Sequence, residues 1–154
     1  MLLDYQSRTS VLLTKILALE FWRIQPKWVN ASSGYEGKID HDTAGVVIGD
    51  RTFHMNNTYE FEYDLSEEWK KFTGLPFVFA CWVSNKKLEN SKINILQDAL
   101  EYGLNNIQQV IKEEGMNYQE FDVENYLLKS LKYKLDEKME QGMALFLQKA
   151  SNFR

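Results

Sequence analysis

The sequence predicts an α/β fold, in which helices cover a mostly parallel sheet. One reason is a continuously apolar run at residues 77–84, Phe-Val-Phe-Ala-Cys-Trp-Val-Ser, since strands that are apolar on both sides belong to sheets covered on both faces. The other reason is that strand and helix patterns alternate before this run. We therefore expect residues 1–84 to form an α/β lobe and residues 85–154 to form a separate helical segment.

The composition fits a single folded domain. The chain has 154 residues, of which 44% are hydrophobic and 26% are charged, and these values argue for a substantial core and against disorder. The 22 acidic and 18 basic residues form no long block of one sign, so we expect no nucleic-acid partner. The sequence has neither an apolar stretch of membrane-spanning length nor a signal-peptide pattern, which predicts a cytoplasmic protein without membrane contact.

The first predicted elements are short. Residues 2–5 have the character of a strand end, and residues 7–10, Ser-Arg-Thr-Ser, open a helix with apolar residues at helical spacing. Residues 27–30 add a second short strand. Residues 44–48, Ala-Gly-Val-Val-Ile, form a buried type of strand that leads into a short helix at Gly49.

A strand and a helix are predicted next. Residues 60–64, Glu-Phe-Glu-Tyr-Asp, alternate with period two, which is typical of a half-exposed strand. Residues 65–73 form a short amphipathic helix with Asp64 or Ser66 as its cap and Gly74 at its end.

The apolar run at residues 77–84 is the predicted buried strand, and it places Cys81 and Trp82 in the core. Beyond it the character of the chain changes, because apolar residues recur at helical spacing. This spacing predicts three further helices, at residues 91–114, 122–133 and 136–153.

Neither histidine indicates a metal site. His41 lies in a polar connection and His54 follows Phe53, and neither stands at metal-ligand spacing from a cysteine or a carboxylate. The sequence also lacks a Walker loop, a dinucleotide fingerprint and a nucleophile elbow. We therefore expect two surface histidines, no metal and no cofactor.

Four motifs carry a family resemblance. They are Ser-Arg-Thr-Ser-Val at 7–11, Val-Ile-Gly-Asp-Arg at 47–51, Tyr-Asp-Leu-x-Glu-Glu-Trp at 63–69 and Gly-Leu-Pro-Phe-Val-Phe-Ala-x-Trp-Val at 74–83. Over nearly its whole length the chain resembles the chorismate dehydratases, which open the futalosine route to menaquinone. The related 1,4-dihydroxy-6-naphthoate synthases share the fold, but their Gly-Leu-Pro segment does not continue as Phe-Val-Phe-Ala-x-Trp.

The resemblance implies a fold like that of type II periplasmic binding proteins, with two lobes around a cleft. Residues 2–75 would form the second lobe, and residues 77–84 would be the strand that returns to the first lobe. The helices at residues 91–154 would then belong to that first lobe. Members of the family begin with a further segment that builds the first lobe, and this chain has no counterpart of it.

This departure from the family leads to several expectations. The chain would be a fragment, or a separate N-terminal chain would complement it, and alone it would be inactive. Its uncovered helices would cause it to form a homodimer, to aggregate or to be poorly ordered. The alternatives are a small-carboxylate binding module of the same fold and an inactive remnant, because fold alone does not decide function.

The implied reaction removes water from chorismate to give 3-[(1-carboxyvinyl)oxy]benzoate, so two carboxylates must be held. The best candidate for one carboxylate site is the helix start formed by Ser7, Arg8, Thr9 and Ser10. A helix start offers unpaired N–H groups and the positive end of the helix dipole, and here the hydroxyls add donors. Spacing alone favours plain capping at this position, whereas the resemblance favours carboxylate binding.

Two further groups complete the expected site. Gly49 and Asp50 follow a buried strand, where open α/β folds place ligand groups. Gly49 would let the backbone approach the substrate, and Asp50 would cap the next helix or act as a base. Pro76 and Phe77 would form the apolar floor of the cleft, or simply a helix stop and a turn. Arg51 is expected at the surface, and no residue is identified as the principal base.

Overall fold

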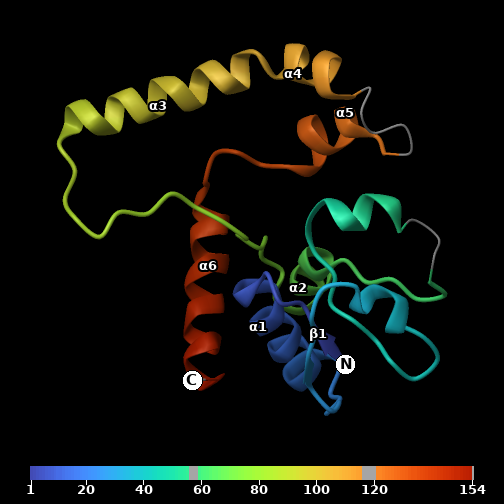
Figure 1. Cartoon of the computed structure of the whole chain (residues 1–154). Helices are drawn as coiled ribbons and strands as arrows, with labels where there is room; N and C mark the ends of the chain where they lie inside the picture. The colour runs from blue at the N-terminus through green and yellow to red at the C-terminus, as the bar shows by residue number, and fades with distance from the viewer. Residues whose placement is uncertain (56–58, 116–120, 154) are drawn as a thin grey trace. The chain divides into compact units, whose positions relative to one another are not determined.

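The computed structural model describes residues 1–55, 59–115 and 121–153, and Figure 1 shows the chain coloured from its N-terminus to its C-terminus. The chain forms two compact units. The first, which we call the terminal unit, contains Met1–Phe79 and Leu135–Arg154, and the second, the middle unit, contains Ala80–Lys134. The assignment of residues 1–84 and 85–154 to two lobes stays a prediction.

The terminal unit combines helices with a small parallel sheet, which confirms the α/β class. Strand β1 (Leu2–Leu3) pairs in parallel with β2 (Val29–Asn30), so that Leu2 lies opposite Val29. Both strands fall where the sequence predicts them. The expected strand at residues 44–48 contributes one parallel bridge between Leu2 and Gly45, held by two hydrogen bonds of 2.8 and 2.9 Å to the backbone of Leu2.

The first helix begins where its sequence predicts. Helix α1 (Arg8–Ile16) has Ser7 as its N-cap and continues as the π-helix η1 (Leu17–Phe21). Its buried face is apolar, with Leu13 and Ile16 fully buried. That face anchors the core of the terminal unit.

Helix α2 (Leu65–Thr73) matches the predicted helix residue for residue. Its cap is Asp64, whose carboxylate accepts the backbone N–H groups of Ser66 and Glu67 at 2.8 and 2.9 Å. Gly74 ends the helix with φ of 75°, a left-handed conformation that glycine adopts without strain.

Helix α6 (Glu137–Ala150) closes the core of the terminal unit, followed by the short 3₁₀ turn η6 (Ser151–Phe153). Asp136 caps it by accepting the backbone N–H of Met139 at 2.8 Å. In Figure 1 α6 runs alongside α1. The buried cluster between these helices and α2 consists of Leu13, Ile16, Leu17, Trp69 and Phe146.

Two predicted strands are wrong. Residues 60–64 and 77–84 contain no strand in the structure. Within the apolar run, exposure rises along the chain until Trp82 is 76% exposed, and Cys81 is also exposed. A run that is apolar on both sides becomes buried only between neighbouring strands and covering layers, and no described strand pairs with this one. The placement of Cys81 and Trp82 in the core is therefore wrong as well.

The described residues of the middle unit form helices but no buried core. Its elements are α3 (Asn90–Asn105), α4 (Ile107–Glu114), α5 (Val123–Asn125) and the π-helix η5 (Tyr126–Ser130). None of the residues described in this unit is buried, so its apolar stripes stay partly exposed.

Two of the helices predicted for the middle unit differ from those observed. The expected helix at 91–114 is two helices, because Asn106 leaves the helical conformation with φ of −107° and its side-chain amide donates to the carbonyl of Tyr102 at 2.8 Å. An asparagine side chain that bonds nearby backbone competes with helix continuation in this way. The expected helix at 122–133 begins after Asp122 as predicted and ends at Ser130.

Among the residues that the structure describes, no helix is both long enough and apolar enough to cross a membrane.

Candidate functional site

The predicted site residues at Ser7–Ser10 and at Gly49–Asp50 follow two neighbouring parallel segments. Strand β1 ends at Leu3, and α1 begins five residues later, at Arg8. The segment that bridges to β1 at Gly45 leads into the 3₁₀ helix η3 (Gly49–His54). Open α/β folds bind ligands at these carboxyl ends. The structure thus brings both predicted groups to the same edge of the small sheet.

The start of α1 has a capping role. Ser7 Oγ accepts the backbone N–H of Ser10 at 3.0 Å, and the Ser10 carbonyl accepts the hydroxyl of Thr14 at 2.8 Å. Ser7 and Ser10 are therefore engaged in the helix itself, with Ser10 buried. Arg8 is exposed and Thr9 is half-buried in the first turn, which carries no acidic residue. The backbone N–H groups of Arg8 and Thr9 lie at the positive end of the helix, where no carbonyl of the same helix can accept them.

A partly buried ion-pair cluster lies directly before this helix start. We call it the Asp4 cluster, and it consists of Asp4, Gln6, Tyr35, Glu36 and Arg51. The Asp4 carboxylate accepts the backbone N–H of Gln6 at 2.7 Å, the hydroxyl of Tyr35 at 2.8 Å and Nη2 of Arg51 at 2.5 Å. Arg51 also donates to Glu36 through Nη1 and to the side-chain oxygen of Gln6 at 3.2 Å. Tyr35 and Glu36 come from the 3₁₀ helix η2 (Tyr35–Lys38).

The carboxylates of the Asp4 cluster stabilise the positive charge of Arg51. Two carboxylates face one guanidinium, so the cluster is formally anionic. Burial and the neighbouring Asp4 raise the pKa of Tyr35 above its usual value. For Arg51, burial lowers the pKa, but the hydrogen bonds to Glu36 and Asp4 outweigh it and the pKa rises. The cluster therefore holds structure together rather than offering a free positive charge to an anion.

Gly49, Asp50 and Arg51 differ in part from what their sequence predicts. Gly49 has φ of 73°, a conformation that favours glycine. The N-cap of η3 is Ile48, with no side-chain cap bond, so the predicted capping role of Asp50 is wrong; Asp50 is exposed in the first turn. Arg51 is half-buried in the Asp4 cluster instead of lying free at the surface, because two carboxylates hold it.

Pro76 and Phe77 are half-buried, and Phe77 packs against the core of the terminal unit. The ring of Phe77 packs edge-on against Trp69 and Phe146, with centroid distances of 5.5 and 4.9 Å. The carbonyl of Pro76 lies against Gly142 of α6. Their expected role as the floor of a cleft stays a prediction.

The two histidines are exposed, as predicted. His41 lies beside Asp40, with 3.3 Å between Nε2 and Oδ2. Within residues 1–55, 59–115 and 121–153, no group of three His, Cys, Asp or Glu side chains is arranged to hold a metal ion.

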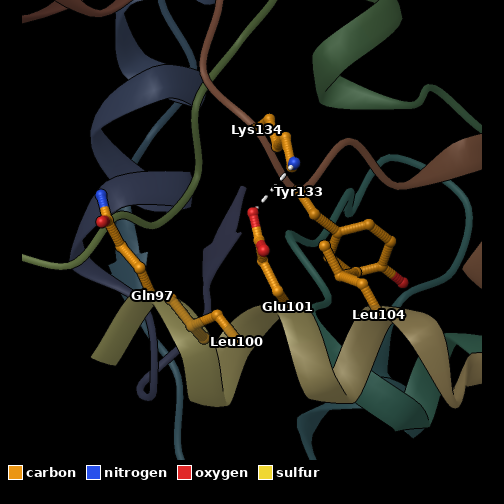
Figure 2. A pocket seen from close by; sticks show the side chains of 6 residues that line it. All are labelled: Gln97, Leu100, Glu101, Leu104, Tyr133 and Lys134. Carbon is orange, nitrogen blue, oxygen red and sulfur yellow. Dashed lines mark ion pairs between the residues drawn. The ribbon is translucent and has the colours of Figure 1, made fainter. Parts of the chain in front are cut away.

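Figure 2 shows a hollow within the middle unit, with a volume of about 400 Å³. Its charged side chains, Glu101 and Lys134, are exposed and pair with each other at 3.5 Å. Tyr133 donates its hydroxyl to the carbonyl of Leu127 at 2.9 Å. Specific ligand sites usually present buried polar groups, which this hollow lacks. It is lined by Gln97, Leu100, Glu101, Leu104, Tyr133 and Lys134.

The Asp4 cluster is the part of this region that sequence reasoning missed. Asp4 gave a signal, since a carboxylate directly after a strand lies at the ligand-binding edge of an α/β sheet. Tyr35 and Glu36 gave none, because they come from an irregular connection whose path the local sequence does not determine.

Polar groups gathered beyond the carboxyl ends of adjacent parallel segments are typical of α/β proteins that bind small molecules. The chain belongs to the menaquinone biosynthesis family, whose model matches residues 1–152. It thus has a role in menaquinone biosynthesis and is a member of a family of biosynthetic enzymes. This confirms the part of the resemblance that concerns menaquinone.

Proposed function

We propose that the chain provides the second lobe and the C-terminal helices of the first lobe of a chorismate dehydratase, a cytoplasmic lyase of the futalosine route to menaquinone. The reaction removes water from chorismate and yields 3-[(1-carboxyvinyl)oxy]benzoate. Two findings support it: the family match over residues 1–152 and the motif Gly-Leu-Pro-Phe-Val-Phe-Ala-x-Trp-Val at 74–83. The proposal includes the two-lobed fold of type II periplasmic binding proteins.

The observation that carries the proposal is the position of the α1 start beside the Gly49 turn. One substrate carboxylate would accept the N–H groups of Arg8 and Thr9 and the hydroxyl of Thr9, at a helix end without acidic residues. The side chain of Arg8 is exposed there and adds positive charge. Arg51 is not part of this anion site, because Asp4 and Glu36 neutralise it.

The chemistry asked of the protein is modest, because the ring becomes aromatic as water leaves. The protein must hold the dianion, accept a ring proton and help hydroxide depart. Asp50 is the candidate base on this chain, since its exposed carboxylate follows Gly49 in the turn. The second substrate carboxylate would be bound by the other lobe of the cleft.

The direct test is a titration of the chain with chorismate, followed by the amide resonances of residues 8–10 and 49–50. We expect saturable shifts in both groups, and weaker binding of benzoate, which has one carboxylate. Absence of chorismate binding would contradict the proposal. A parallel assay of the aromatic product by absorbance should show no turnover by the chain alone. Turnover would establish the reaction and overturn the expectation that a second lobe is required.

Thr9 allows a sharper test of the carboxylate site. A Thr9→Val variant should weaken chorismate binding by about tenfold, because a hydrogen bond to a charged group contributes about 1.5–3 kcal/mol. Its stability should stay nearly unchanged, since Thr and Val have similar helix propensities. Thr9→Ser is the matched control, because it keeps the hydroxyl and should bind nearly as wild type does. Equal affinity of the Val variant would rule out this role for Thr9.

A further inference from the structure

Arg51 links three segments that are far apart in the sequence. It belongs to η3, two residues after Gly49. Its guanidinium binds Asp4 and Gln6, in the segment that leads into α1, and Glu36 in η2. The guanidinium carbon also lies 5.5 Å from the ring centre of Tyr5, within the range of a cation–π contact.

Asp4 gives this link a rigid anchor. Its side chain is 0% exposed, and it has three donors: the backbone of Gln6, the hydroxyl of Tyr35 and the guanidinium of Arg51. A buried carboxylate with several donors stays in one position, because losing a partner leaves an uncompensated charge. The segment from Asp4 to Ser7 therefore provides a fixed point directly before α1.

The Gly49 turn is joined to the start of α1 through Arg51. It begins a 3₁₀ helix of six residues that has no side-chain cap bond at its N-terminus. Thr52 donates its hydroxyl to the carbonyl of Gly49 at 2.8 Å, a bond internal to the turn. The bonds from Arg51 to Asp4 and Gln6, by contrast, fix the turn relative to the start of α1.

We propose that Arg51 is a positioning residue, which holds the Gly49–Asp50 turn against the start of α1 and thereby sets the affinity for a substrate carboxylate without touching it. This inference rests on the proposed function for its ligand, and on the contacts of Arg51 for its geometry. Small displacements of binding groups are costly because their contacts depend on tight geometry. Lysine is a poor replacement, since it lacks the planar fork of donors that reaches Asp4 and Glu36 together.

The first experiment needs no ligand. Amide spectra of Arg51→Lys and Arg51→Met should show large shifts or broadening at Gly49 and Asp50, whereas Gly74, at the end of α2, should stay as in wild type. Lys38→Gln is the matched control, because it removes an exposed cation from η2 and should leave Gly49 unchanged. Unchanged Gly49 and Asp50 resonances in both Arg51 variants would overturn the positioning role.

The second experiment is a chorismate titration of the same variants. In wild type the Thr9 and Gly49 amides should respond with one Kd. In Arg51→Met the Kd should rise about tenfold and the Gly49 response should fall, while the Thr9 amide still responds. Glu36→Gln should have a smaller effect, because Arg51 keeps its bond to Asp4. A fall in thermal stability would not distinguish a positioning role from a structural one, because replacing a purely structural arginine would also lower the stability.

The outcomes separate the two proposals. An unchanged Kd and an unchanged Gly49 response in Arg51→Met would overturn the positioning role even if wild type binds chorismate. If wild type binds no chorismate, the proposed function fails and the effect on affinity fails with it. The ligand-free spectra would still decide whether Arg51 holds the turn.

Discussion

A Trp69→Ala variant is expected to lose about 3–5 kcal/mol of unfolding free energy and to leave much of the terminal unit unfolded. Trp69 is fully buried, and its ring contacts Phe72, Phe77 and Phe146 at centroid distances of 5.5 to 6.2 Å. It therefore joins α2 to α6 and to the Gly-Leu-Pro turn. Domains of this size have a total stability of about 5–15 kcal/mol, so the loss is a large share. Urea denaturation followed by circular dichroism measures it.

Trp69→Phe is the control for Trp69→Ala, and we expect it to lose much less stability. The indole Nε1 is buried and makes no hydrogen bond within the described part of the chain. A buried donor without a partner costs about 1–3 kcal/mol, and phenylalanine removes this cost while keeping most of the aromatic contacts. We expect Trp69→Phe to lose less than about 1.5 kcal/mol. A loss as large as that of Trp69→Ala would show that the core depends on the indole itself.

A Gly142→Ala variant should destabilise the terminal unit by about 2–3 kcal/mol. A Cβ atom at this position would lie 2.2 Å from the carbonyl oxygen of Pro76 and 3.5 Å from Cβ of Leu75. Both neighbours belong to the turn after α2, so α6 would have to move away from it. The urea midpoint should fall, although alanine favours a helix over glycine by about 1 kcal/mol.

Gly103→Ala is the matched control for this substitution. Gly103 also lies within a helix, α3, but a Cβ atom there would meet no described atom within 4 Å beyond its own stretch of helix. The change should leave helix content the same or slightly higher, because alanine loses less backbone entropy than glycine on folding. A rise in stability for Gly142→Ala, of the size expected for Gly103→Ala, would refute the close contact between α6 and Pro76.

The helices were the most predictable part of the fold. For α2, the carboxylate of Asp64 and the left-handed Gly74 are local signals that mark the two ends. Ser7 and Asp136 mark the starts of α1 and α6 in the same way. These signals are sufficient because each helix satisfies its own backbone hydrogen bonds.

The strands were less predictable, because a strand needs partners from elsewhere in the chain. The run at 77–84 has a strand-like composition, yet Trp82 is 76% exposed and no described strand pairs with the run. The segment at 44–48 shows the same dependence, since its pairing is limited to the bridge at Gly45. Apolar composition indicates that a segment can be buried, but it does not identify the segments that would cover it.

In the candidate site, too, the local features were predictable and the contacts between distant segments were not. Residues 7–10 and Gly49 were predicted as site residues from motifs, and the structure places them at one edge of the sheet. The Asp4 cluster was not predicted, because its members are separated by up to 47 positions along the chain. Their contacts depend on the path of the connection that carries Tyr35 and Glu36.

The amino-acid order thus decided where helices start and stop, and it marked the α1 start and the Gly49 turn as sites of interest. Both depend on interactions within a few residues, such as caps, turns and helical spacing. The fold decided which strand-like segments pair, that Arg51 is neutralised by Asp4 and Glu36, and that Phe77 packs against a core. These features arise from contacts between distant segments, whose geometry exists only once the chain has folded.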